Sequence, residues 1–270
     1  PMVYPSHYIT GFLNFKNPIG LSAGFYKNAE LTQIIPSIGF GFMEAGSITG
    51  EYCEGNPRPR LWRMPKSKSL VVWYGLKNDG CEKISKQLKN KKFRIPVGIS
   101  VAKTNSPKTV DITDGINDYI KTSKTFRDAN IGDYFTINIS CPNAYGGEPF
   151  TNPRYLELLL TKFNNLEIKK PVFLKLSPDL TYDVIDEIIE IAKRNNIQGF
   201  ICANLTKKRD NPKIIKEDLK GIPEDKGGIS GKIMENLSDN LVSYIYKKTN
   251  GKYIIIGCGG IFSAEDAYKK

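Results

Sequence analysis

The sequence has little histidine and no closely spaced cysteines, and both shortages narrow the chemistry open to it. Its 270 residues include one histidine, His7, so we expect no Ser–His or Cys–His pair here. Five cysteines occur without any Cys-x-x-Cys spacing. An odd number excludes a complete disulfide framework, and the spacing is not that of a zinc site. Acid–base chemistry is therefore left to Cys, Lys, Asp, Glu or Tyr, and we expect a reducing compartment and no metal.

Long hydrophobic runs are also missing. No apolar run approaches the roughly 18 residues that span a bilayer, and the N-terminus carries no secretory signal. Hydrophobic residues make up 40% of the chain and charged residues 25%, which is typical of a globular protein with a real core. The net charge is +11, but the lysines are spread along the chain, which favours a basic surface over a nucleic-acid face. We expect a cytoplasmic protein that binds no nucleic acid, and anionic small molecules remain compatible ligands.

Short apolar runs alternate with longer amphipathic segments along the chain. This alternation predicts a parallel sheet covered by helices. The short runs are apolar along most of their length, as expected when both faces of the sheet are buried. The strands are expected at 19–23, 40–45, 95–101, 134–139, 172–176, 199–203 and 253–256, and the helices at 31–38, 82–88, 112–126, 154–165, 182–193 and 237–248.

Seven such units predict an α/β protein with a (β/α)₈ TIM barrel that lacks its last strand–helix unit in this chain. The competing fold is an open doubly wound sheet, which would gather polar residues at one switch point. Here polar or glycine-rich sequence follows every expected strand, which favours the barrel. We expect a single domain over 1–270, a helix that starts at Ala264 and a truncated C-terminal end. Segment 48–80, rich in Arg, Trp and Tyr, is predicted to form a lid or surface subdomain between the second and third strands.

The most informative stretch is Asn138-Ile-Ser-Cys-Pro-Asn143, directly after an expected strand. Pro142 holds Cys141 extended, and a thiol flanked by carboxamides at the mouth of a fold suits an acid or a base. The alternative is an ordinary strand-to-loop turn.

Two lysines and two glycine clusters add further chemistry. Lys175 lies inside an apolar strand, where a buried ammonium needs an anion or a strong acceptor; the alternative is an edge strand facing water. Lys27 follows the first expected strand, where an ordinary loop lysine is the alternative. Turns at Gly227–Gly231 and Gly257–Gly260 could cradle a phosphate with backbone N–H groups, as barrels do after their last strands. A phosphorylated cofactor whose ring lies across the barrel mouth is the predicted ligand.

Together these motifs resemble the dihydroorotate dehydrogenase family, the FMN-dependent barrels of pyrimidine synthesis. The resemblance covers nearly the whole chain, and its most specific pieces are 17–25, 39–47, 55–60, 138–143, 175–180, 227–231 and 256–260. It implies FMN-dependent oxidation of dihydroorotate to orotate in the de novo synthesis of UMP.

The resemblance also implies roles for individual residues. Cys141 would be the catalytic base while hydride passes to the flavin, and Lys175 would stabilise the negative charge of the reduced ring. Lys27 would pair with the substrate carboxylate. The pyrimidine would be bound by the carboxamides of Asn138, Asn143 and Asn204. The implied flavin contacts are Ala23, Gly24, Ser47, Ser100, Asn138, Lys175, Ser230, Gly231, Gly259 and Gly260.

Subclass features point in two directions. Segment 55–60 resembles the membrane-associated, quinone-using class, whereas Cys141 resembles the soluble classes, since the quinone class usually has serine there. We expect a quinone as electron acceptor ahead of fumarate. The N-terminal membrane extension of the quinone class is not in this chain, so peripheral membrane association depends on one existing; a homodimer is also compatible. Val72 and Leu205 stand where the family usually has asparagine and threonine, which puts substrate specificity in doubt.

Two other functions stay open at this point. One is a related flavin barrel that acts on another reduced pyrimidine, such as dihydrouridine in tRNA. The other is a catalytically inactive barrel kept for binding, which Val72 and Leu205 would support.

Overall fold

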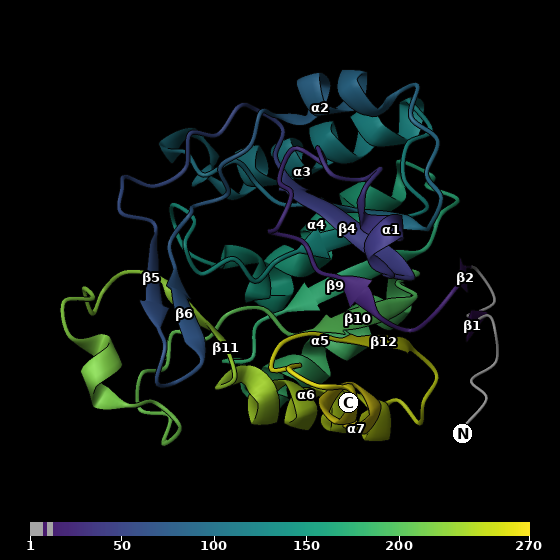
Figure 1. The fold of residues 1–270 in the computed structure, drawn as a ribbon. Helices are drawn as coiled ribbons and strands as arrows, with labels where there is room; N and C mark the ends of the chain where they lie inside the picture. Colours follow the sequence, from purple (N-terminus) through teal and green to yellow (C-terminus); the bar gives the residue numbers. More distant parts are fainter. Residues whose placement is uncertain (1–7, 10–12) are drawn as a thin grey trace.

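The computed structural model describes residues 8–9 and 13–270, and its centre is a curled parallel sheet with helices outside it (Figure 1). Seven strands run in the spatial order β3 (Gly20–Leu21), β4 (Phe42–Ile48), β7 (Val97–Val101), β8 (Tyr134–Asn138), β9 (Val172–Leu176), β10 (Gly199–Cys202) and β12 (Ile254–Gly257). Each pair of neighbours is parallel, which confirms the predicted barrel-like α/β fold.

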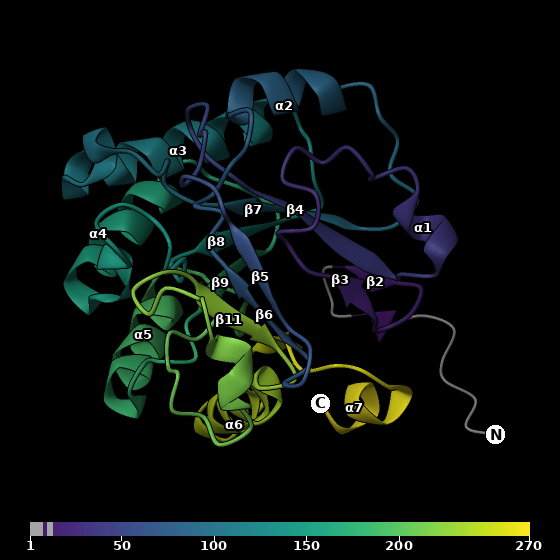
Figure 2. The ribbon, with the colours of Figure 1, turned by 60° about the vertical axis from the view of Figure 1, so that its left-hand side comes forward.

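Helices cover the outside of this sheet (Figure 2). They are α1 (Ile35–Ile38), α2 (Cys81–Leu88), α3 (Ile112–Asp128), α4 (Pro153–Asn164), α5 (Tyr182–Arg194), α6 (Met234–Lys248) and α7 (Ala264–Lys269). The expected helix over 31–38 is wrong in extent, because residues 31–34 form turns and the helix proper is one turn long. Within residues 8–9 and 13–270, no helix combines the length and apolar character needed to cross a bilayer.

Sequence chemistry explains where the longer helices start. The Asp111 carboxylate accepts hydrogen bonds from the backbone N–H groups of Thr113 and Asp114, which caps α3 as predicted. Asn152 caps α4 in the same way, and Pro153 occupies the first helical position, where its missing N–H costs nothing. On α5 the buried residues recur at helical spacing, so one face packs against the sheet.

The excursion between β4 and β7 is built on a hairpin of β5 (Leu61–Met64) and β6 (Ser69–Val72). A third strand, β11 (Gly228–Gly231), pairs antiparallel with β6. The prediction of a glycine turn at Gly227–Gly231 is therefore wrong for most of that segment, because four of its residues extend along β6. In Figure 1 this small sheet stands at the end toward which β9 points, while β1 (Tyr8–Ile9) and β2 (Asn14–Phe15) lie at the opposite end.

Aromatic side chains fill the inside of the barrel. Phe42, Tyr134, Phe173 and Ile201 come from four different strands and pack into one cluster, with Phe15 of β2 against Phe42. Tyr134 and Phe173 meet edge to face with ring centroids 5.4 Å apart. Side chains alternate between the two faces of a strand, so the residue two places after each interior aromatic also points inward. The strand ends therefore carry the side chains that line the barrel mouth.

Candidate active site

Polar side chains form a belt where the barrel strands end. The Ser47 hydroxyl on β4 lies 2.8 Å from the Ser100 hydroxyl on β7. The Asn138 side-chain amide on β8 donates to the Ser47 oxygen over 2.8 Å. Asn138 is also the register partner of Lys175 on β9. Four predicted site residues from four strands are thus brought together.

Lys175 is a buried cation without a carboxylate partner in the described part of the chain. It is 4% exposed and shares the inward face of β9 with Phe173. Its Nζ donates to the Ser22 hydroxyl over 3.3 Å, and no ion pair among residues 13–270 includes it. The Cys258 thiol donates to the same Ser22 oxygen, also over 3.3 Å. An ammonium in this setting has hydrogen-bonding capacity left for an electron-rich acceptor at the barrel mouth.

Cys141 lies in the loop after β8, partly buried against Cys53, Leu76 and Ala102. Burial raises the pKa of its thiol. The backbone N–H of Asn143 and the positive charge of Lys27 oppose that rise in pKa. A thiol with a raised pKa is mostly protonated at neutral pH, so it needs an acceptor for its proton before it can act as a base.

Lys27 lies opposite this thiol, with its Nζ 4.5 Å from the centre of the Tyr74 ring. Burial lowers the pKa of Lys27 to about 8. The Cys141 side chain raises this pKa, whereas the positive charges of Arg60 and Lys77 lower it further. The barrel mouth therefore holds a cation whose charge is lost just above neutral pH.

The carboxamides of Asn143 and Asn204 are held by backbone atoms. Asn143 Nδ2 donates to the Val72 carbonyl over 2.8 Å, and Asn204 Nδ2 donates to the Ser140 carbonyl over 2.8 Å. Asn204 Oδ1 accepts the N–H of Leu205 over 2.9 Å. Because every residue type except proline offers these backbone groups, the unusual Val72 and Leu205 still hold the two asparagines in place.

The predicted phosphate-binding glycines gather around the start of α6. Gly259 and Gly260 have φ values of +102° and +75°, and a Cβ on Gly260 would come within 2.4 Å of the Glu235 backbone. Only glycine allows the chain to pass so close to the helix. Ser230 and Gly231 approach from β11, and α6 begins without a side-chain cap. The N–H of Glu235 in its first turn donates to the Lys232 carbonyl over 3.2 Å, and the positive end of the helix dipole faces the glycines.

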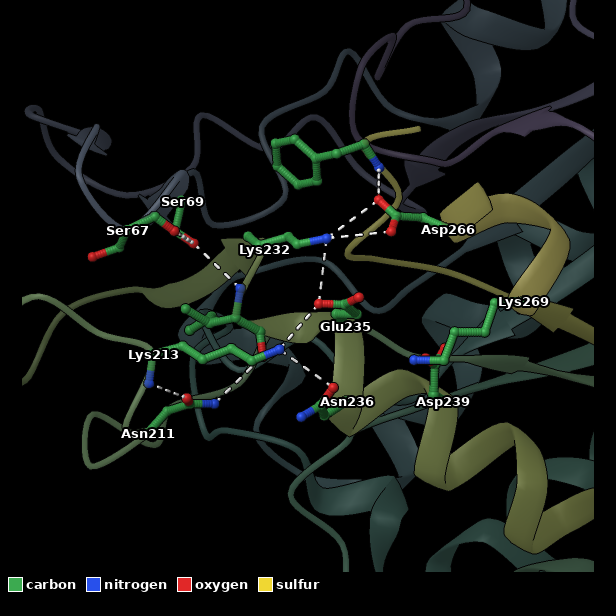
Figure 3. Close-up of polar contacts among 12 residues, drawn as sticks. Ser67, Ser69, Asn211, Lys213, Lys232, Glu235, Asn236, Asp239, Asp266 and Lys269 are labelled. Carbon is green, nitrogen blue, oxygen red and sulfur yellow. Dashed lines mark hydrogen bonds and ion pairs between the residues drawn. The ribbon is translucent and has the colours of Figure 1, made fainter. Parts of the chain in front are cut away.

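Charged side chains surround this helix start (Figure 3). Lys232 Nζ lies 3.3 Å from carboxylate oxygens of both Glu235 and Asp266. Lys213 Nζ lies 3.0 Å from Glu235. These ion pairs tie β11, α6 and α7 together and hold two cations beside the glycines.

At the end of β3, Ala23 and Gly24 leave the backbone open. The Gly24 N–H donates to the Gly46 carbonyl over 2.8 Å. A Cβ built on Gly24, whose φ is +113°, would meet nothing within 4 Å. A flat ring could therefore approach this backbone closely.

Sequence reasoning missed four side chains that contribute to this mouth. They are Ser22, Tyr74, Lys103 and Glu148. Lys103 and Glu148 lie in the loops after β7 and β8, and polar residues after strands were already expected to line the site. Nothing in the sequence places either of them near Cys141. His7 lies outside the described residues, and among those described no three His, Cys, Asp or Glu side chains gather as a metal site would require.

Known proteins match this chain over almost its whole length. The family model described as dihydroorotate dehydrogenase matches residues 8–270. The chain belongs to the dihydroorotate dehydrogenase family. A relative from Trichodesmium erythraeum named dihydroorotate dehydrogenase (quinone) is 38% identical over 265 residues, which is 96% of this chain and 69% of that protein. One of the same name from Gloeobacter violaceus is 35% identical over 260 residues, covering 96% of this chain and 70% of that protein.

Solved structures of the dihydroorotate dehydrogenase family have the same fold. The ligand-free enzyme of Eimeria tenella superposes with a TM-score of 0.83 at 27% identity, over 97% of this chain and 77% of that one. The Eimeria tenella enzyme in complex with ferulenol gives a TM-score of 0.82 over 97% of this chain and 75% of that one.

Proposed function

We propose that this chain oxidises dihydroorotate to orotate in pyrimidine biosynthesis, with FMN as its cofactor and a quinone as the electron acceptor. The observation that carries this proposal is the family match over residues 8–270, which includes every strand of the barrel. Relatives named for the quinone acceptor agree with segment 55–60 and favour a quinone over fumarate. Family membership also favours dihydroorotate over tRNA dihydrouridine and over an inactive barrel.

The residues at the barrel mouth fit FMN. Lys175 offers a buried ammonium without a carboxylate partner, which suits an electron-rich ring edge. Gly24 has open space beside it, and the start of α6 with Gly259 and Gly260 suits a phosphate. The ring would be held by Ala23, Gly24, Ser47, Ser100, Asn138 and Lys175, and the ribityl phosphate by Ser230, Gly231, Gly259 and Gly260. When bound, FMN supplies the acceptor for a hydride from the substrate.

The remaining steps belong to side chains of this chain. The Lys27 ammonium would bind the substrate carboxylate. Because burial lowers the pKa of Lys27 to about 8, that binding would depend on pH. Asn138, Asn143 and Asn204 would orient the pyrimidine through hydrogen bonds. The Cys141 thiolate would accept the proton from the substrate carbon as the C–H bond breaks.

Anaerobic mixing tests this function directly. The protein should purify yellow, and dihydroorotate should bleach its flavin absorbance. A quinone should then restore the colour faster than fumarate does. A protein that carries flavin but is not bleached by dihydroorotate, or is bleached by dihydrouridine in tRNA instead, would contradict the proposal.

Peripheral membrane association and a homodimer stay predictions. Co-flotation with lipid vesicles checks the first, and the mass of the protein in solution checks the second.

A further inference from the structure

We propose that Glu148 carries the proton of Cys141 to solvent through a cavity that has room for one water molecule. The inference rests on the proposed function, in which Cys141 is the base. It assigns a role to a residue that neither the motifs nor the resemblance singled out.

The cavity lies beside Cys141 and is bounded in part by the loop that follows β8. It measures about 10 Å³ and is lined by Cys141, Glu148, Lys103 and Tyr119, with apolar contacts from Leu76 and Phe150. A cavity of about that size holds a single water molecule when polar groups line it. Cys141 and Glu148 thus line the same small space, and the Glu148 charge is close enough to raise the pKa of the Cys141 thiol.

Glu148 suits an acceptor that works near neutral pH. Burial raises the pKa of Glu148 to about 7, and the negative charge of Asp179 adds to the rise. The positive charge of Lys207 and a hydrogen bond from Ser177 oppose it. A relay group is most effective when its pKa is close to the working pH.

The other titratable groups facing this cavity are poor carriers. Tyr119 donates its hydroxyl to the Asn138 carbonyl over 2.7 Å, and burial raises the pKa of Tyr119 far above neutral. Lys103 is 3% exposed and donates to the Tyr145 carbonyl over 2.6 Å. Lys27 lies next to the thiol but is assigned to the substrate carboxylate. Glu148 is partly exposed, so it can exchange its proton with solvent.

The relay moves one proton from Cys141 through the water and Glu148 to solvent. The Cys141 sulfur holds a proton both in the resting protein, because its pKa is raised, and again after each substrate oxidation. The S–H bond breaks, the water accepts that proton and gives one of its own to the Glu148 carboxylate. The carboxylic acid then releases its proton to solvent, and the thiolate is ready for the next substrate.

Anaerobic stopped-flow reduction of the flavin by dihydroorotate, measured from pH 5.5 to 9, tests the relay. In the wild-type protein the rate should rise as pH increases through about 7, where Glu148 loses its proton. Glu148→Gln should reduce the flavin about tenfold or more slowly at pH 7 and lose this inflection, because it cannot accept a proton. Added imidazole or formate should restore part of the rate by replacing the missing acceptor.

The matched control is Glu187→Gln, which removes one carboxylate from the exposed face of α5 and should behave as wild type. A Glu148→Gln protein with the wild-type rate and inflection would overturn the relay. So would a slow variant that keeps the inflection and is not rescued, since that result indicates a structural role. If the wild-type protein binds flavin but dihydroorotate never reduces it, the proposed function itself fails, and the relay with it.

Discussion

The depressed pKa of Lys27 predicts that orotate binding weakens between pH 7 and pH 9. In the proposed function Lys27 pairs with the carboxylate of the ligand, and only its ammonium form can do so. Burial lowers its pKa to about 8, and the positive charges of Arg60 and Lys77 act in the same direction. Raising the pH through about 8 therefore removes the positive charge that binds the carboxylate, and affinity for orotate falls.

The size of the effect follows from the charged fraction. With a pKa of about 8, roughly 90% of Lys27 is charged at pH 7 and roughly 10% at pH 9. Apparent affinity scales with the competent fraction, so the Kd for orotate should rise about ninefold over this range. An unburied lysine with a pKa of about 10.4 would leave the Kd nearly constant between these pH values.

The assay is titration of the yellow protein with orotate, followed by the change in flavin absorbance at constant ionic strength. Orotate is the product, so its binding needs no proton transfer from Cys141. Lys27→Arg is the matched variant, since a guanidinium stays charged throughout this range and should give a flat profile. A wild-type Kd that does not change from pH 7 to pH 9, or a Lys27→Arg profile as steep as that of the wild type, would refute the reasoning.

Four further outcomes are expected. Cys141→Ala should slow flavin reduction by roughly 10²–10⁴, and Cys141→Ser should keep partial reduction with a shifted pH profile; an unchanged rate in the alanine variant would remove Cys141 from the mechanism. Lys175→Met should slow reduction by about tenfold or more and weaken flavin retention, both measured on protein of confirmed fold. Leu159→Ala, at a fully buried position of α4, should lower the free energy of unfolding by about 2–5 kcal/mol in a denaturant titration. Glu148 binds a proton more tightly when folded, so it makes stability fall as pH rises from about 4.5 to 7. Melting curves of Glu148→Gln should therefore lack this part of the wild-type decline.

The strand positions and the belt residues were predictable because an apolar run and the polar residues that follow it are local features. Val172–Leu176 is the strand that its apolar run predicts, and Lys175 points inward because Phe173 does. Asn138 and Lys175, each expected as a contact to the flavin, are register partners because parallel strands bring their carboxyl ends to one edge. The predicted start of α3 at Asp111 follows from its own cap in the same local way.

Long-range pairing could not be predicted in this way. Gly228–Gly231 reads as a turn because glycine is usually found in turns, yet it is a strand because β6 offers it an unpaired edge. The excursion that contains β6 lies more than 150 residues earlier in the chain, and no local pattern links β6 with β11. The raised pKa of Glu148 could not be predicted from local sequence either, because it comes from burial and from the charge of Asp179 in another loop.

By itself, the sequence determined the alternation of strands and helices, the inward-facing chemistry at each strand end and the family to which the chain belongs. These features depend on neighbours within a few residues, where backbone geometry leaves few choices. The tertiary structure alone decided which side chains share a cavity, what holds the asparagines and how far each pKa moves. Those properties depend on burial and on charges brought close from distant segments, and both exist only once the chain has folded.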